Sequence, residues 1–99
     1  MKVRKGIRSM KRTVITVVGK DQVGIIAKVC AYLADNKINI LDISQTIVQG
    51  FFNMMMIVDA TEASKDFDEI SEELERLGGQ IGGIIKAQHE DIFDKMHRI

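Results

Sequence analysis

The sequence predicts an α+β fold in which two helices cover one face of a four-stranded antiparallel sheet. Two kinds of pattern alternate along the 99 residues. Short β-branched or alternating runs are typical of strands, and two longer stretches with apolar residues at i, i+3, i+4 and i+7 are typical of amphipathic helices. The order is βαββαβ. Two right-handed βαβ crossovers interleaved around a hairpin give the ferredoxin-like arrangement, with both helices on one face.

The first strand and the first helix flank a charged loop. The run TVITVV at 13–18 is rich in β-branched residues and ends at Gly19, which predicts a buried strand. A helix is predicted at 22–36, with Asp21 as its N-cap and Asn36 as the left-handed residue that ends it. Its apolar stripe consists of Ile26, Val29, Cys30 and Leu33.

Two extended runs, 38–48 and 51–60, follow and join at Gln49-Gly50, which predicts a hairpin. The second run, FFNMMMIVDA, is apolar at both alternating sets of positions. One set is Phe52, Met54, Met56 and Val58, and the other is Phe51, Met55 and Ile57. A strand that is apolar on both sides is not expected to leave one side in water. We therefore expect the second face to be covered by the C-terminal segment, by another subunit, or by both.

The second helix is expected to open at Ser64 or Asp66 and to close at Gly78-Gly79. Its apolar positions are Phe67, Ile70, Leu74 and Leu77. A fourth strand is predicted at 81–89, and the ending DIFDKMHRI predicts a short amphipathic helix. The expected organisation is a basic, disordered extension at 1–11, one domain at 12–90 and a C-terminal helix at 91–99.

Composition points to one small domain outside the membrane. Hydrophobic residues make up 45% and charged residues 28%, and no apolar run approaches the roughly 20 residues of a membrane span. The apolar run after the basic start is too short for a secretory signal, and Met10 is a second candidate for the natural start. The single cysteine, Cys30, fits a reducing compartment. We expect a cytoplasmic protein that binds no membrane.

The charges are unevenly distributed although the formal net charge is zero. Of the 14 basic residues, 6 precede the first strand and leave 8 basic against 14 acidic residues in the rest of the chain. These six are Lys2, Arg4, Lys5, Arg8, Lys11 and Arg12. Such an arm can be solubilising or can touch nucleic acid, but the acidic remainder offers no surface that would follow a phosphate backbone. We expect no nucleic-acid partner.

No catalytic or metal-binding pattern stands out. The stretch GKDQVGII at 19–26 has two glycines at P-loop spacing, but the lysine and hydroxyl residue of a P-loop do not follow the second one. Cys30 lies on the core stripe, and His89 and His97 have no third metal ligand at a convincing spacing. The glutamates of the second helix are expected to form a solvated face. We expect a protein without catalytic activity, metal or cofactor.

The segment VVGKDQVGIIAKV followed by NKINILDISQTIVQGFF resembles the ACT domain, a small regulatory module of amino-acid metabolism, over residues 11–89. Typical ACT loops read D-R-P-G-[ILV] after the first strand, and here D-Q-V-G-I replaces the proline with Val23. The whole pattern, with DISQTI, QGFF and the ending IFDKMHRI, is most similar to the stand-alone ACT proteins of the UPF0237 family and more distantly to the glycine-cleavage repressor type.

The resemblance implies a ligand site and an assembly. ACT domains hold the backbone of an amino acid at the loop after the first strand, and an asparagine at the head of the second strand, here Asn39, contacts the ligand amino group. The implied ligand-binding residues are Gly19, Lys20, Asp21, Gln22, Val23, Gly24, Ile25 and Asn39. Free N–H groups at the helix start suit a carboxylate, although Asp21 is equally interpretable as a plain helix cap.

The resemblance also implies a homodimer or higher homo-oligomer joined side by side through edge strands, with ligand bridging the loop and Asn39 across the dimer. The seam would involve 38–48, whose apolar residues would make a free edge an aggregation hazard. The alternative is a structural protein-interaction module, in which the loop is empty and a protein partner docks on the apolar second face.

Overall fold

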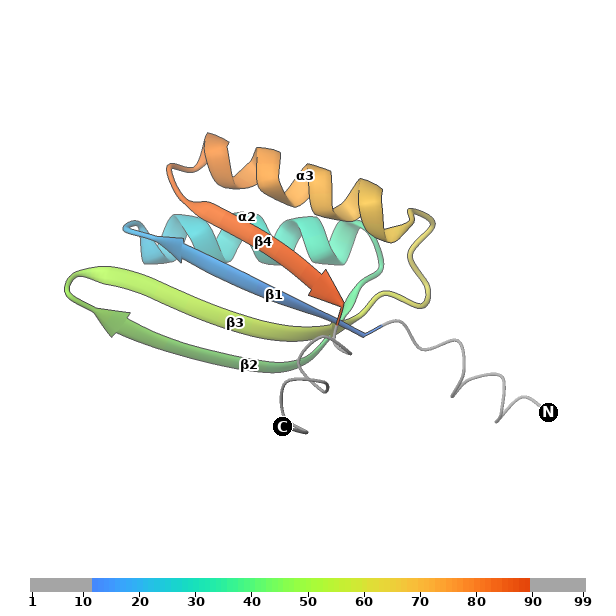
Figure 1. Cartoon of the computed structure of the whole chain (residues 1–99), viewed down its shortest axis with the longest axis horizontal. Helices are drawn as coiled ribbons and strands as arrows, with labels where there is room; N and C mark the ends of the chain where they lie inside the picture. Colours follow the sequence, from blue (N-terminus) through green and yellow to red (C-terminus); the bar gives the residue numbers. More distant parts are fainter. Residues whose placement is uncertain (1–11, 90–99) are drawn as a thin grey trace.

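The computed structural model describes residues 12–89. The extension expected at 1–11 and the helix expected at 91–99 lie outside the described residues. The elements are β1 (Arg12–Gly19), α2 (Gln22–Asp35), β2 (Asn39–Val48), β3 (Phe51–Asp59), α3 (Phe67–Gln80) and β4 (Ile84–His89). The strand order is β2-β3-β1-β4, and every neighbouring pair is antiparallel. The predicted ferredoxin-like fold is confirmed (Figure 1).

The two faces of β3 differ as the alternation predicts. On the face toward the helices, Phe52, Met54, Met56 and Val58 are buried and pair with the inward residues of β1. The core that they join also contains buried residues of both helices, among them Ile25 of α2 and Leu74 of α3. On the other face, Phe51 and Met55 are 43% and 44% exposed. This second face is called the open face below.

The first helix begins where the sequence predicts and ends one residue earlier. Asp21 is the N-cap, and its carboxylate accepts a hydrogen bond of 3.1 Å from the Gly24 N–H. The prediction that Asn36 adopts the left-handed conformation is wrong: its φ is −103°, and the residue with positive φ is Lys37, at 58°. The helix ends in a Schellman motif with Lys37 as its left-handed residue, because the Ile38 N–H donates to the Leu33 carbonyl at 2.9 Å and the Lys37 N–H to that of Ala34 at 3.2 Å. The Asn36 side chain donates to the Tyr32 carbonyl at 2.9 Å.

The second helix begins at Asp66, which forms a capping box with Glu69. The prediction that Gly78-Gly79 closes this helix is wrong, because the helix continues to Gln80. Gly78 is buried and lies so close to β4 that a Cβ would be 2.9 Å from the Ile85 nitrogen. The turn with positive φ falls at Gly82, so β4 starts at Ile84 and not at the predicted residue 81.

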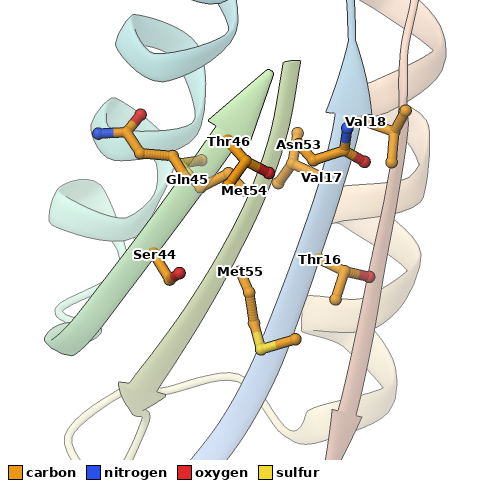
Figure 2. A pocket seen from close by; sticks show the side chains of 9 residues that line it. All are labelled: Thr16, Val17, Val18, Ser44, Gln45, Thr46, Asn53, Met54 and Met55. Atoms are coloured by element: carbon orange, nitrogen blue, oxygen red, sulfur yellow. The ribbon is translucent and has the colours of Figure 1, made fainter. Parts of the chain in front are cut away.

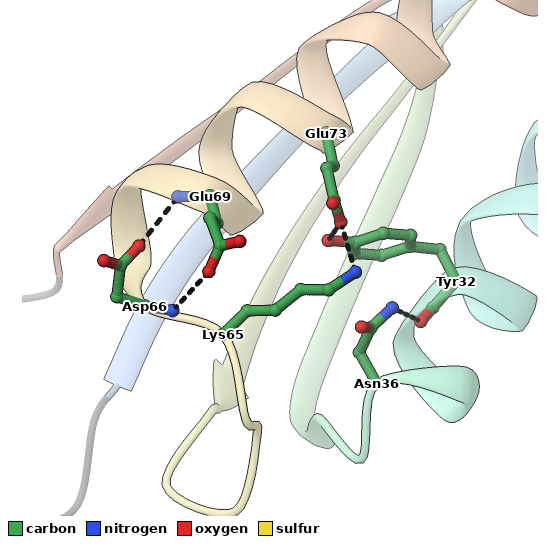
Figure 3. Close-up of polar contacts among 6 residues, drawn as sticks. All are labelled: Tyr32, Asn36, Lys65, Asp66, Glu69 and Glu73. Atoms are coloured by element: carbon green, nitrogen blue, oxygen red, sulfur yellow. Dashed lines mark hydrogen bonds and ion pairs between the residues drawn. The ribbon is translucent and has the colours of Figure 1, made fainter.

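A polar cluster joins the two helices on their outer side (Figure 3). The Tyr32 hydroxyl donates to Glu73 Oε1 at 2.6 Å, and Lys65 Nζ lies 2.8 Å from the same oxygen. Burial and the Glu73 hydrogen bond raise the pKa of Tyr32, and the hydrogen bonds from Lys65 and Tyr32 lower the pKa of Glu73. Glu73 therefore departs from the expected solvated glutamate face, because it is a partner of a tyrosine on the neighbouring helix.

Candidate functional site

The loop after β1 contains two glycines, Gly19 and Gly24. At each of them a neighbouring side chain occupies the space where a Cβ would lie. Gly19 ends β1 and pairs with Phe52, and a Cβ there would meet the Ile25 Cδ1 methyl. A Cβ on Gly24 would lie 2.5 Å from Asp21 Oδ2. The space beside Gly24, where the resemblance implies a ligand, thus already holds the Asp21 carboxylate.

The cap leaves two first-turn donors for a ligand. The Gly24 N–H binds the Asp21 side chain, and the Ile25 N–H binds the Asp21 carbonyl at 2.9 Å. The N–H groups of Gln22 and Val23 precede these and have no carbonyl four residues back within the helix. Val23 is 78% exposed. An anion at this end of α2 would therefore be held by the backbone of Gln22 and Val23.

Lys20 does not lie over the helix start. Its ammonium is 5.3 Å from the centroid of the Phe51 ring, a cation–π contact with the first residue of β3. The Lys20 side chain thus links the loop to the β2–β3 hairpin. Its ammonium group therefore adds no positive charge at the N-terminus of α2.

Asn39 and the loop lie at opposite ends of the sheet. Asn39 pairs with Asp59, whereas Gly19 pairs with Phe52. Phe52 and Asp59 are seven positions apart on β3, which spans about 23 Å at about 3.3 Å per residue. Within one chain, Asn39 therefore lies far from the loop at 19–25, and the implied site residues do not meet.

A pocket of about 360 Å³ surrounds Asn39 at the C-terminal end of α2. It is lined by Ala34, Lys37, Ile38, Asn39, Asp59 and Glu62. The Glu62 carboxylate and the negative end of the helix dipole favour a cation or an ammonium group there, whereas Lys37 opposes one and the Asp59 carboxylate already accepts hydrogen bonds from Thr61. Sequence reasoning missed Asp59, the last residue of β3, and Glu62, in the turn after it, because both are 20 or more positions from Asn39 in the chain.

A second, shallow hollow of about 260 Å³ lies on the open face (Figure 2). Its side chains include Thr16 of β1, Ser44 and Thr46 of β2, and Asn53 and Met55 of β3. Sequence reasoning also missed this hollow, because the small polar residues come from three strands and form no motif in the chain.

Strand β2 is exposed along its whole length and forms one edge of the sheet. The apolar residues Ile43 and Ile47 face the helix side, since they pair with buried Met56 and Phe52, yet they are 40% and 64% exposed. The two helices of the chain thus leave the helix side of β2 uncovered. A surface of this kind is suited to a partner subunit.

Within residues 12–89, no helix is long and apolar enough to cross a membrane. No group of three His, Cys, Asp or Glu side chains in the same part of the chain is arranged to hold a metal ion. Cys30 is a free thiol, half-buried on α2.

Comparison with known proteins identifies the class. The sequence model of the ACT domain matches residues 11–88, and the chain belongs to the ACT domain family. ACT domains are regulatory small-ligand-binding modules and not catalytic ones; they commonly bind amino acids and dimerise.

Within that class the chain is a UPF0237 protein. A UPF0237 protein of Bifidobacterium longum is 59% identical over 90 residues, which cover 91% of this chain and 100% of the relative. One from Methanocaldococcus jannaschii is 49% identical over the same shares of the two chains.

Solved structures agree with the fold. An ACT domain protein from Streptococcus pneumoniae has a TM-score of 0.75 at 38% identity and covers 84% of this chain and 93% of its own. A formyltetrahydrofolate deformylase from Pseudomonas syringae has a TM-score of 0.74 at 21% identity over 90% of this chain and 30% of its own. This second likeness concerns the fold alone.

Proposed function

We propose that the protein is a regulatory module, without catalytic activity of its own, that binds a small amino acid at the seam of a homodimer. The observation that carries this proposal is the placement of the implied site residues at the two ends of α2. The loop at 19–25 lies at one end, and Asn39 lies at the other, beside its pocket.

A second copy supplies the missing half of each site. If two β2 strands pair edge to edge about a two-fold axis, they run antiparallel. The Asn39 end of one strand then lies beside the Val48 end of the other, where the partner's loop is found, since Gly19 and Ile47 both pair with Phe52. The exposed Ile43 and Ile47 give such a pairing apolar surface to bury.

The electrostatics of the two ends suit a zwitterion. The N-terminus of α2 offers the Gln22 and Val23 N–H groups to a carboxylate, with the positive end of the helix dipole. The other end offers Asn39 and Glu62 to an ammonium group, next to Lys37 and to an Asp59 carboxylate that accepts hydrogen bonds from Thr61. Across the seam an amino acid would contact the N-terminus of α2 in one chain and the Asn39 pocket of the other chain. Its binding would favour the dimer by mass action.

A thermal-shift panel of the common amino acids, at millimolar concentration on the full chain, tests this function. A ligand at about 100 times its dissociation constant adds roughly 2.7 kcal/mol, which corresponds to a rise of about 10 °C for a domain of this size. Asn39→Ala is expected to abolish the shift with little change in the ligand-free melting temperature, because Asn39 is exposed. Glu75→Gln, on the exposed side of α3, is the control. A full shift in Asn39→Ala would contradict the site.

The open face favours a second candidate function, docking of a protein partner with no small-molecule ligand. Phe51, Met55 and Ile84 are 43%, 44% and 59% exposed in the single chain. Exposed apolar side chains gathered on one face are typical of a protein–protein contact surface. This alternative predicts no thermal shift with any amino acid, together with a partner that the wild type retains and Met55→Lys loses.

We place either function in the cytoplasm. The single cysteine, Cys30, carries no disulfide and fits a reducing compartment.

A further inference from the structure

The edge of β2 has two unequal halves. Near its start the strand carries a bulge: Ile40 pairs with Val58 and Asp42 pairs with Ile57, so Leu41 is an extra residue. Directly after the bulge, Asp42 Oδ1 accepts a hydrogen bond of 2.9 Å from the Ile43 N–H. From residue 44 to residue 48 the register with β3 is regular. Bulges and charged side chains are the devices by which edge strands resist pairing.

The Ile43 N–H belongs to the outer edge of the sheet. Gln49 and Gly50 both have positive φ, 53° and 82°, and form a two-residue hairpin that closes on Val48 and Phe51. Such a turn closes on a hydrogen-bonded pair, and main-chain groups alternate along a strand. Even-numbered residues from Asp42 to Val48 therefore bond to β3. The outward main-chain groups are those of Ile43, Gln45 and Ile47, and the first of these donors is taken by Asp42.

Three two-fold pairings of β2 with a second copy use the outward groups of Ile43, Gln45 and Ile47, with the axis at Ser44, Gln45 or Thr46. Paired residues lie on one face of a sheet, so a residue on the axis faces its own copy. With the axis at Ser44 or at Gln45, Ile43 pairs with Gln45 or with Ile47 of the second copy, and both pairings require the Ile43 N–H. With the axis at Thr46, Gln45 pairs with Ile47 of the second copy, and Ile43 takes no part. While the Ile43 N–H donates to the Asp42 carboxylate, it cannot donate to a second copy. Only the register at Thr46 then keeps every N–H donor that its hydrogen bonds between the two strands require.

The registers at Ser44 and at Thr46 differ in whether the loop and Asn39 of the proposed ligand site come together. With the axis at Ser44, Asn39 lies level with the end of the partner strand, beside the partner's loop. Moving the axis to Thr46 slides one strand by four residues, about 13 Å at 3.3 Å per residue. Asn39 then lies beyond the partner's hairpin, too far for an amino acid to bridge it to the loop.

We propose that Asp42 selects the register of the seam. In the ligand-free protein the docking surface is 44–48 of β2, and its partner is the same segment of a second copy. When the Asp42 carboxylate leaves the Ile43 N–H, the register at Ser44 becomes available and brings the loop and Asn39 together. This inference rests on the proposed function, since it assumes a β2 seam, and it adds a positioning residue that regulates assembly of the site.

Cysteine cross-linking distinguishes the registers. Ser44 and Thr46 point to the open face, where Figure 2 shows them, and each would face its own copy in one register only. In a non-hydrogen-bonded pair the Cα atoms are about 4.5 Å apart, within reach of a disulfide. Ser44→Cys and Thr46→Cys are made separately in a full chain carrying Cys30→Ser. Each is oxidised without added amino acid, and the rate of disulfide-linked dimer is followed on non-reducing gels.

Thr46→Cys is expected to cross-link about tenfold faster than Ser44→Cys. Adding Asp42→Ala should raise the Ser44→Cys rate about tenfold, because it frees the Ile43 donor. Adding Asp42→Asn should leave the rate low, because the amide oxygen still accepts from Ile43. Asp68→Ala, an exposed acid on α3, is the matched control. Circular dichroism and melting curves of each variant report whether the fold is retained.

Each other outcome overturns the inference in a recognisable way. If Ser44→Cys cross-links as fast as Thr46→Cys, and Asp42→Ala changes neither rate, Asp42 does not select the register while the seam itself stands. If neither of these cysteines nor Gln45→Cys forms a dimer in folded protein, there is no β2 seam, and the homodimeric part of the proposed function fails with it.

Discussion

The two edges of the sheet are finished in different ways. At the β4 edge, α3 lies so close that Gly78 touches the backbone of Ile85, and the side chain of Ile85 is 1% exposed. At the β2 edge all ten residues are exposed, including Ile43 and Ile47 on the helix side. The chain thus covers its core at the β4 edge and leaves the helix side of β2 uncovered, where we propose that a second copy binds. Stability and assembly should accordingly respond to different residues.

Shortening one side chain in the core and one on β2 should affect stability by very different amounts. Leu74→Ala, at a position with 0% exposure in the core, should lower the free energy of unfolding by about 3 kcal/mol. Ile47→Ala, at 64% exposure, should change the stability of the monomer by less than about 0.5 kcal/mol. Urea titrations at a dilution where the protein is monomeric measure both values. A loss above about 2 kcal/mol in Ile47→Ala would show that β2 contributes to the core of the single chain.

Adjacent glycines at the β4 edge should respond with opposite signs. Gly78→Ala places a Cβ 2.9 Å from the Ile85 nitrogen and 3.1 Å from its Cγ1, so it should destabilise the fold by about 1–3 kcal/mol. Gly79→Ala meets nothing within 4 Å and should stabilise the helix by about 0.5–1 kcal/mol. Thermal melts of the two variants in parallel provide the measurement. Equal effects would mean that α3 does not approach β4 as closely as described.

An effect smaller than those of Leu74→Ala and Gly78→Ala is expected on the outer side of the helices, where Tyr32 meets Glu73. Tyr32→Phe should cost about 1 kcal/mol near pH 7 by removing one hydrogen bond. Because the folded state lowers the pKa of Glu73, this contribution is present above the ordinary value of 4.5 and is lost as the pH falls below it. The difference between wild type and Tyr32→Phe should therefore shrink on acidification.

Urea titrations of both proteins at several pH values between 3 and 7 measure this dependence. Glu72→Gln, which changes an exposed glutamate on the same helix, should show no such trend. A difference that stays constant down to pH 3 would mean that the charge on Glu73 is irrelevant to the Tyr32 contact.

The sequence predicts most of the fold because its apolar residues repeat clearly at strand or helix spacing. Alternation in β3 separates buried Met54 and Met56 from exposed Met55, and helical spacing places Val29 and Leu33 in the core. The ends of elements are less predictable, since they depend on contacts across the fold. Gly78-Gly79 has the composition of a helix stop, but Gly78 is there because Ile85 leaves no room for a side chain.

The candidate site was predictable only in part. The loop motif points to Asp21 and Gly24, and the structure joins them in a single cap. Glu62 and Asp59 have no local signal, because they reach the Asn39 pocket through sheet pairing and the turn after β3. The bond from Ile43 to Asp42 is equally hidden, since it depends on a bulge that no residue type requires.

The exposure of β2 also bears on the order in which the chain folds. This strand is tied to the rest by its ladder with β3 and by a two-residue turn, so its absence would leave the core of helices, β1, β3 and β4 largely intact. It should dock late and open first. In the monomer, the outward amides of Gln45 and Ile47 should exchange with solvent almost unprotected, whereas those of β1, paired on both sides, should exchange only when the whole domain unfolds.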